Sequence, residues 1–192
     1  MPAFLDSTRE RLILPALRPV YDYAAKPAVW VVLRLAVGLT LMMSGWPKLA
    51  SPLGMSGMLE GMGFWPGWLW SPLVALTEFG AGLLIAIGLF TRPAAVAATI
   101  LLLVTLWFHA SNPYGPTALT PEGIAFLTGE GAQYLTEFGR QQLAADGGAG
   151  FLSQVTGKAV YASMFWALGA ALFAAFGGGY LSVDRLLLSR EF

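Results

Sequence analysis

The sequence predicts an all-α integral membrane protein, a four-helix bundle with an outer loop of short amphipathic helices. Composition is the first indication, because 56% of the 192 residues are hydrophobic and 11% are charged, whereas soluble domains carry about 25% charged residues. The second is that four apolar stretches reach the ~20 residues that a helix needs to cross ~30 Å of hydrocarbon. These stretches cover residues 28–50, 68–90, 93–111 and 159–181, within a four-span domain that extends from 28 to 190.

The composition also excludes several classes of function. The formal net charge is zero, so nothing indicates a nucleic-acid partner. Because the chain has no cysteine and a single histidine, it cannot form a disulfide, a thiolate cluster or a bis-histidine haem site. One histidine and one glutamate also fall short of the three or four ligands that zinc takes. We therefore expect no metal and no covalently bound cofactor, and any redox role depends on a diffusible one.

Residues 1–27 are predicted to form a cytoplasmic amphipathic segment. Charged residues there are interspersed with aliphatic ones such as Ile13 and Leu17, and prolines interrupt the run. Such a pattern is typical of a segment that lies on the membrane surface. No apolar core followed by a small-residue cleavage site is present, so we expect no cleaved signal peptide.

Small residues and rare charges share one face in each of the first two spans. Spacings of three and four residues place side chains on the same face of a helix, and ionisable groups within a span are expected to face other helices. Glycines on such a face let two backbones approach closely. The face carries Arg34, Gly38, Leu41, Gly45 and Lys48 in the first span, and Ser71, Ala75, Glu78, Gly82 and Ala86 in the second.

The second and third spans are expected to form a helical hairpin folded at Thr91-Arg92-Pro93, since proline suits the first turn of a helix. The third span carries Thr105 and His109 one turn apart on one face. The fourth is rich in alanine and glycine, and its ionisable groups are Tyr161 and Tyr180. The two arms of this hairpin therefore carry the ionisable residues Glu78 and His109 within otherwise apolar spans.

Two longer segments are predicted on the outer side. Residues 51–67 form a loop rich in glycine, methionine and tryptophan, and residues 112–158 form an outer insertion. A helix start at Thr120, a break at Gly129 and a glycine-rich turn at 146–150 divide this insertion. We expect two short helices that lie on the outer face of the bundle.

The distribution of basic residues sets the expected orientation. Near the ends of the spans, seven lysines and arginines fall on one side and three on the other. Cytoplasmic loops of membrane proteins carry the excess of basic residues. We therefore expect a multi-pass protein of the bacterial inner (cytoplasmic) membrane, with both termini in the cytoplasm.

The outer half of the bundle holds a candidate ligand pocket. At ~1.5 Å of helix rise per residue, Lys48, Glu78 and His109 share this half, whereas Arg34 lies nearer the cytoplasm. Six of the seven tryptophans gather toward the same side, which is typical of an aromatic belt and also fits an aromatic-walled pocket. Glu78 and His109 are the candidate proton carriers. The candidate ligand-binding residues are Arg34, Trp46, Lys48, Trp70, Glu78, Thr105, Trp107 and His109.

Glu78 and His109 each have a structural alternative. Glu78 either fixes helix register through an ion pair with Lys48 or Arg34, Lys48 being favoured by depth, or holds a proton or a polar ligand near the midplane. His109 either bonds a loop carbonyl or donates to a quinone or oxyanion oxygen. A ligand would enter from the outer half, between the second and third spans.

Three motifs resemble the DoxX family of small bacterial membrane proteins. They are Arg34–Gly38, Gly45–Leu49 and Glu78–Ala95, and the resemblance extends over about residues 30–110. It implies a four-helix membrane bundle related to DoxD, the quinone-reactive subunit of an archaeal thiosulfate:quinone oxidoreductase. Some relatives are associated with oxidant defence and with thiol or sulfur metabolism. The arginine, lysine and glutamate of these motifs match the family pattern.

These observations leave two main functions open. The first is a quinone-interacting subunit of a membrane redox system, with no electron carrier of its own. The alternative is a non-catalytic accessory or structural subunit of a larger respiratory or photosynthetic complex, in which the buried charges fix helix register. A small transporter ranks below both, because no inverted repeat is evident. Lipids and other membrane subunits are the expected partners, and whether the chain catalyses a reaction is left open.

Overall fold

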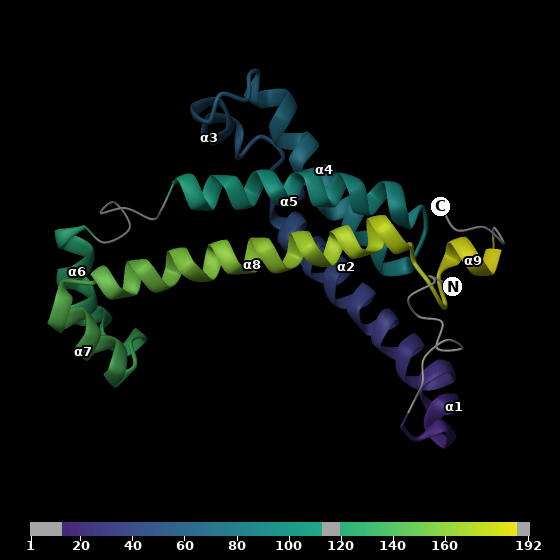
Figure 1. Ribbon diagram of the computed structural model, residues 1–192. Coiled ribbons are helices and arrows are strands. Elements are labelled where there is room, and N and C mark those ends of the chain that lie inside the picture. Colours follow the sequence, from purple (N-terminus) through teal and green to yellow (C-terminus); the bar gives the residue numbers. More distant parts are fainter. Residues whose placement is uncertain (1–12, 113–119, 188–192) are drawn as a thin grey trace. The chain divides into compact units, whose positions relative to one another are not determined.

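The computed structural model describes residues 13–112 and 120–187, and these ranges contain helices and turns but no strand (Figure 1). They divide into two compact units. The first comprises the described part of 1–101 together with that of 166–192, and the second comprises 102–165. Two long helices, α5 (Thr91–Ser111) and α8 (Ala149–Phe176), contribute residues to both units.

Four helical runs are long and apolar enough to cross a membrane, which confirms the predicted all-α membrane architecture. They are Pro15–Ala50, Gly67–Ile87, Thr91–Ser111 and Ala149–Phe176. Each overlaps one of the four predicted spans, whereas their ends differ from the prediction by up to thirteen residues, most of all at the N-terminus of the first.

The first run is longer than predicted because helical turns precede the span itself. A 3₁₀ turn (Pro15–Leu17), α1 (Arg18–Val20) and a π-helical turn (Tyr21–Ala25) lead directly into α2 (Lys26–Ala50). Proline lacks the N–H that an α-helical hydrogen bond requires, and the π-turn lies between two prolines of the sequence, at positions 19 and 27. From Pro15 onward the predicted surface segment is thus helical and continuous with α2, while residues 1–12 lie outside the described residues.

α2 and α4 (Gly67–Ile87) pack with their backbones in direct contact. A Cβ atom added at Gly38 would lie 2.6 Å from the backbone nitrogen of Ala86, and one added at Gly45 would lie 2.6 Å from that of Phe79. From the other helix, a Cβ at Gly82 would lie 2.8 Å from the carbonyl oxygen of Gly38. Since each position admits only hydrogen, the predicted glycine face is confirmed as the contact between these helices.

The turn between α4 and α5 comes three residues earlier than predicted. Gly88 ends α4 in the left-handed conformation (φ 75°), where glycine carries no steric penalty. The side chain of Asp184 then caps the start of α5, because its carboxylate accepts hydrogen bonds from the backbone nitrogens of Phe90 (2.8 Å) and Thr91 (3.0 Å). The Thr91 hydroxyl donates to the same carboxylate at 2.9 Å. This cap is supplied from a distant part of the chain and has no local sequence signal.

The fourth predicted span, 159–181, corresponds to α8, which begins ten residues earlier and ends five residues earlier. Its start follows a turn at Gly147 and Gly148, both at positive φ, so the predicted glycine-rich turn is confirmed. The early residues of α8 were missed because polar side chains such as Lys158 lower their hydropathy. After α8, a short loop leads to α9 (Val183–Leu187).

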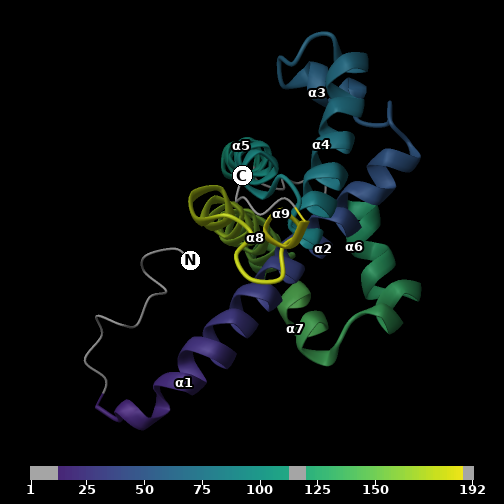
Figure 2. The same cartoon turned by 90° about the vertical axis from the view of Figure 1, so that its right-hand side faces the viewer.

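The predicted outer loop at 51–67 contains a helix, α3 (Ser56–Gly61), which lies beyond the N-terminal end of α4 (Figure 2). Two polar side chains fasten it to α4. The hydroxyl of Ser71 donates to the carbonyl of Pro52 (2.6 Å) and accepts from the backbone nitrogen of Met55 (3.2 Å). The carboxylate of Glu60 accepts from the backbone nitrogen of Gly67 at 2.8 Å, which satisfies a free N–H at the start of α4.

The second unit contains α6 (Pro121–Thr128), a 3₁₀ turn (Glu130–Tyr134) and α7 (Glu137–Asp146). The side chain of Thr120 caps α6 by accepting from the backbone nitrogen of Gly123 at 3.0 Å, so the predicted helix start is confirmed. The break at Gly129 is confirmed too.

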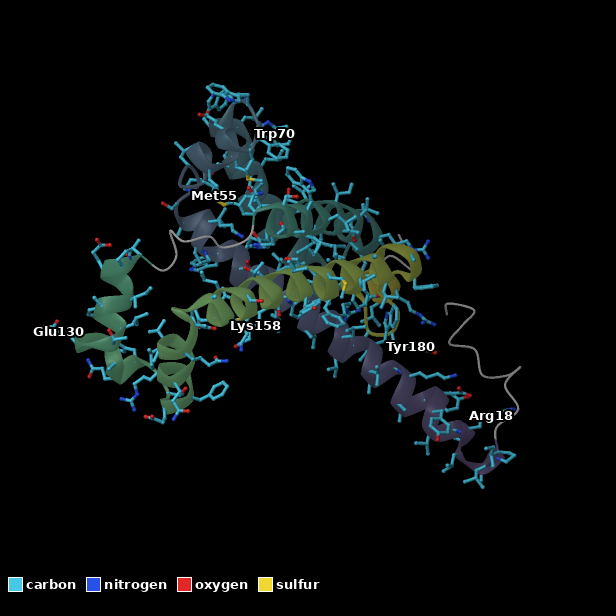
Figure 3. All side chains as sticks on the ribbon, turned by 60° about the vertical axis from the view of Figure 1, so that its left-hand side comes forward. Arg18, Met55, Trp70, Glu130, Lys158 and Tyr180 are labelled. Carbon is cyan, nitrogen blue, oxygen red and sulfur yellow. The ribbon has the colours of Figure 1, made fainter. Side chains whose placement is uncertain are left out.

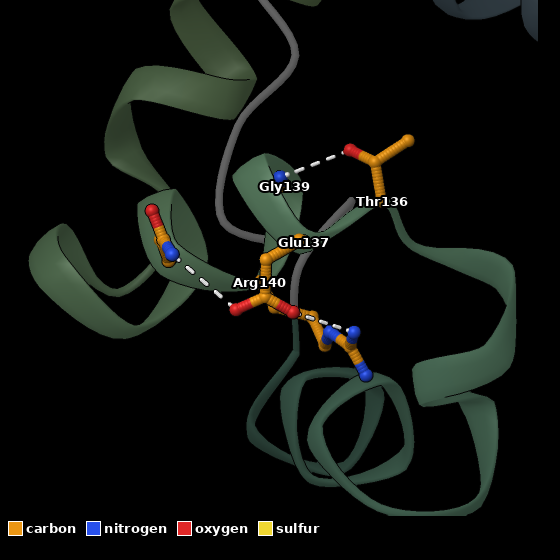
Figure 4. A network of polar contacts seen from close by, with 5 residues as sticks. Thr136, Glu137, Gly139 and Arg140 are labelled. Carbon is orange, nitrogen blue, oxygen red and sulfur yellow. Dashed lines mark hydrogen bonds and ion pairs between the residues drawn. The ribbon is translucent and has the colours of Figure 1, made fainter.

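Thr136 caps α7 in the same way, accepting from Gly139, and Glu137 pairs with Arg140 on the first turn (Figure 4). Part of the predicted insertion, residues 113–119, lies outside the described residues. That the short helices lie on the outer face of the bundle stays a prediction.

The packing of α2 against α4 predicts a specific response to added methyl groups. Gly82→Ala should lower the free energy of unfolding in detergent by ~1–3 kcal/mol, because the methyl group must push two backbones apart. The matched control is Gly80→Ala on the same helix, where an added Cβ meets nothing within 4 Å. There the gain in helix propensity, roughly 0.5–1 kcal/mol, should appear as stabilisation. Equal thermal stabilities of the two variants would contradict this packing.

Candidate functional site

An ion pair joins the C-terminal end of α2 to the middle of α4. The ammonium of Lys48, in the last turn of α2, contacts the Oε2 atom of Glu78. Ser44, one turn earlier on α2, offers a second acceptor at 3.4 Å from the Lys48 Nζ atom. Of the two partners predicted for Glu78, the structure therefore shows Lys48. The pair forms because Gly45 lies against the backbone of Phe79, which brings the two helices within side-chain reach.

The two partners differ in exposure. The Glu78 side chain is 9% exposed and the Lys48 side chain 30%. A carboxylate withdrawn from solvent requires a neighbouring cation or a hydrogen-bond donor to remain charged. The half-buried ammonium supplies that cation, and its remaining N–H groups can still reach a ligand that approaches from the open side.

An open apolar groove of about 490 Å³ lies on the same two helices, at the level of this pair along α2. Its lining consists of Met42, Met43, Trp46 and Phe79. Phe79 directly follows Glu78 in α4, and its ring contacts that of Trp46 with centroids 5.8 Å apart. Sequence analysis singled out Trp46 alone among these four, because the other three are ordinary apolar residues of a span. That residues of α2 and α4 line one groove becomes visible only once the two helices are paired.

Arg34 contacts the loop after α8 and not Glu78. Its Nη1 atom donates to the carbonyl oxygens of Gly178 (2.7 Å) and Tyr180 (3.3 Å), and its Nη2 atom donates to that of Leu181 (2.9 Å). The residue is buried, with 3% of its surface exposed. Because buried loop carbonyls need hydrogen-bond donors from elsewhere in the chain, Arg34 stabilises the loop that follows α8. We therefore leave it out of the ligand site.

The other predicted site residues lie elsewhere. Trp70 belongs to a cluster at the start of α4, where its indole nitrogen donates to the carbonyl of Trp65 (3.3 Å) and its ring contacts that of Phe64 (Figure 3). It precedes Glu78 by eight residues, or ~12 Å of helix. Thr105, Trp107 and His109 belong to the part of α5 in the second unit, and their role in a ligand site stays a prediction.

The ion pair predicts a non-additive response to mutation. Removing one partner leaves the other charge uncompensated, whereas removing both avoids this cost. Glu78→Gln and Lys48→Met should each lower thermal stability in detergent more than the double variant does. Because Lys48 is partly exposed, we expect each single loss at or below the ~3 kcal/mol lower end found for fully buried pairs. Additive losses in the double-mutant cycle would show that the two side chains do not interact.

The contacts of Arg34 predict that lysine cannot replace arginine at this position without a loss of stability. An ammonium has the same charge as a guanidinium but cannot match its fork of donors, so Arg34→Lys should lose bonds to the 178–181 carbonyls. Hydrogen bonds to charged groups contribute ~1.5–3 kcal/mol each, and a clear drop in thermal stability should follow. Arg92→Lys is the control, since Arg92 lies exposed on α5. Equal behaviour of the two variants would exclude the Arg34 contacts.

Comparison with known proteins identifies the family of this chain. The profile of the DoxX family matches residues 29–110, a stretch that holds Arg34, Lys48 and Glu78. The inner membrane protein YqjF of Escherichia coli (strain K12) is 36% identical over 90 residues, which cover 46% of this chain and 68% of YqjF. No solved structure matches the chain. Together with the four apolar helices, these matches show that the chain is a membrane protein that belongs to the DoxX family.

Proposed function

We propose that this protein is a quinone-interacting subunit of a membrane redox system and that the outer end of α2 and α4 binds the quinone head group. The observation that supports the proposal is that α2 and α4 carry both the Lys48–Glu78 pair and, at the same level along α2, the groove of Met42, Met43, Trp46 and Phe79. A quinone has a polar, redox-active ring and a long apolar tail. Two helices that offer a charged donor, a carboxylate and an open apolar groove at one level supply the chemistry that both parts require.

Each side chain has a distinct task in this proposal. The Lys48 ammonium donates a hydrogen bond to one carbonyl oxygen of the quinone, and the ring lies against Trp46 and Phe79. Reduction of a quinone to a quinol takes up two electrons and two protons. Glu78, which can hold or release a proton within reach of the ring oxygen, passes protons to it. The electrons come from a partner, since this chain has no cysteine ligands and no haem-ligand pair.

The membrane and the orientation belong to the same proposal. The similar protein of E. coli is named an inner membrane protein, and we place this chain in the same kind of membrane. The excess of basic residues at one side puts both termini in the cytoplasm. Lys48 and Glu78 then lie in the outer half, where a quinone would enter from the outer leaflet.

The second candidate function is an accessory subunit of a larger membrane complex. The Lys48–Glu78 pair supports it as well, as a contact that fixes helix register. Lys48 and Glu78 join α2 to α4, and a pair that fixes helix register needs no ligand. The two functions differ in what happens when both charges are removed. If the pair only fixes helix register, replacing both residues should leave the fold intact and should not change the binding of any ligand.

Quinone binding to the full-length protein in vesicles tests the proposal. We expect a soluble quinone analogue to quench tryptophan fluorescence saturably. The variant Lys48→Met/Glu78→Gln should bind about 10–100-fold more weakly, as expected for the loss of ~1.5–3 kcal/mol of hydrogen bonding to charged groups. The control, Arg140→Met/Glu137→Gln, removes an exposed ion pair of α7 and should leave the affinity unchanged. Unchanged affinity in the first variant, or no saturable quenching in the unmodified protein, would favour the accessory subunit.

A further inference from the structure

The first helical run is too long for the membrane that it crosses. It extends over 36 residues from Pro15 to Ala50, or ~54 Å at ~1.5 Å per residue, whereas the hydrocarbon core is ~30 Å thick. The 25 residues of α2 already account for ~38 Å. The turns between Pro15 and Ala25, which continue the line of α2 in Figure 1, therefore lie outside the hydrocarbon.

This extension, residues 13–25, has one apolar face. Leu17, Val20 and Ala24 follow one another at spacings of three and four residues, which places them on one side of the helical turns, and Ile13 lies in the bend just before these turns. Ile13, Leu17 and Val20 are exposed, by 97%, 40% and 54% of their surface. Large apolar side chains in a continuous exposed stripe indicate an interaction surface.

The opposite face of the extension is charged. Arg18, Asp22 and Lys26 follow one another at intervals of four residues, and the Nζ atom of Lys26 lies 3.5 Å from the Oδ1 atom of Asp22. Figure 3 shows Arg18 on this part of the chain, at the far end from Trp70. A helix with an aliphatic stripe on one side and basic residues on the other has the character of a membrane-surface helix.

The bilayer itself is the apolar phase closest to the stripe. The last residue of the stripe, Ala24, lies two positions before α2 begins, so lipid that surrounds α2 lies within one helical turn. The chain also has a place to bend there. The π-turn Tyr21–Ala25 lies between Pro19 and Pro27, and both π-turns and prolines are common causes of helix kinks.

We infer that residues 13–25 lie in the lipid–water interface at the N-terminal end of α2 and that, in a bilayer, the chain bends at the π-turn away from the axis of α2. The stripe of Leu17, Val20 and Ala24, with Ile13 before it, enters the boundary between head groups and acyl chains. Arg18, Asp22 and Lys26 lie on the side away from the acyl chains. This surface binds lipid and holds α2 at a fixed depth, and it does so whether or not the outer site binds a quinone.

Spin labels on single cysteines test this inference directly, since the natural chain has no cysteine. Full-length variants Leu17→Cys, Val20→Cys and Asp22→Cys are labelled and reconstituted into vesicles of phosphatidylethanolamine and phosphatidylglycerol. Collision rates are then measured with oxygen, which concentrates in lipid, and with a water-soluble nickel chelate present on both sides. Val32→Cys, an exposed position within α2, serves as the reference for a label in lipid.

The ratio of oxygen to nickel collisions should be severalfold higher at Leu17 and Val20 than at Asp22, and it should approach that at Val32. Equal access of the nickel chelate to all three positions would show an extension surrounded by water and overturn the inference. Low access of both reagents at Leu17 and Val20 would show that protein covers the stripe, either a second copy or a partner, and would overturn it as well.

Discussion

The rest of the first unit depends on the close approach of α2 and α4. Gly38 and Gly45 on one helix and Gly82 on the other remove the side chains that would hold the two backbones apart. In a membrane, where lipid tails are as apolar as the side chains, association relies on such packing and on polar contacts rather than on exclusion of water. The glycine contacts therefore determine which side chains of the two helices can meet.

Polar contacts then fix each end of this unit. At the C-terminal end of α2, Lys48 reaches Glu78 because Gly45, which has no side chain, lies against the backbone of Phe79. At the other end, Arg34 holds the carbonyls that follow α8, and Asp184, beyond that loop, caps α5. The two ends differ in how far their polar side chains are exposed. Arg34 and Asp184 are buried and bond mainly to backbone groups, whereas the Lys48 side chain is 30% exposed.

Much of the fold could be predicted from the sequence because a membrane imposes simple rules. Four apolar stretches of sufficient length predict four helices, and the 4-3-4-3 spacing from Arg34 to Lys48 predicts which face of α2 is buried. Helix ends were less predictable. The end of α4 has a local signal, because Gly88 readily adopts the left-handed conformation that ends a helix. The start of α5 has none, because its cap, Asp184, lies far along the chain.

The charged residues of the site could be predicted from the sequence, whereas most of the apolar residues that line the groove could not. Glu78 stands out as a carboxylate within an apolar span, and depth favoured Lys48 as its partner. Arg34 shares the same face and charge, and only the three-dimensional position of the 178–181 carbonyls separates its role from that of Lys48. Met42, Met43 and Phe79 carry no signal of their own, since an apolar residue in a span is expected everywhere.

The central claim is that the Lys48–Glu78 pair and its groove hold a quinone. The most direct measurement is the quinone content of the protein purified from its native membrane, with the Lys48→Met/Glu78→Gln variant prepared in parallel. The account predicts a stoichiometric amount of quinone with the unmodified protein and its loss from the variant. Absence of quinone from the unmodified protein, or an equal amount in both preparations, would contradict it.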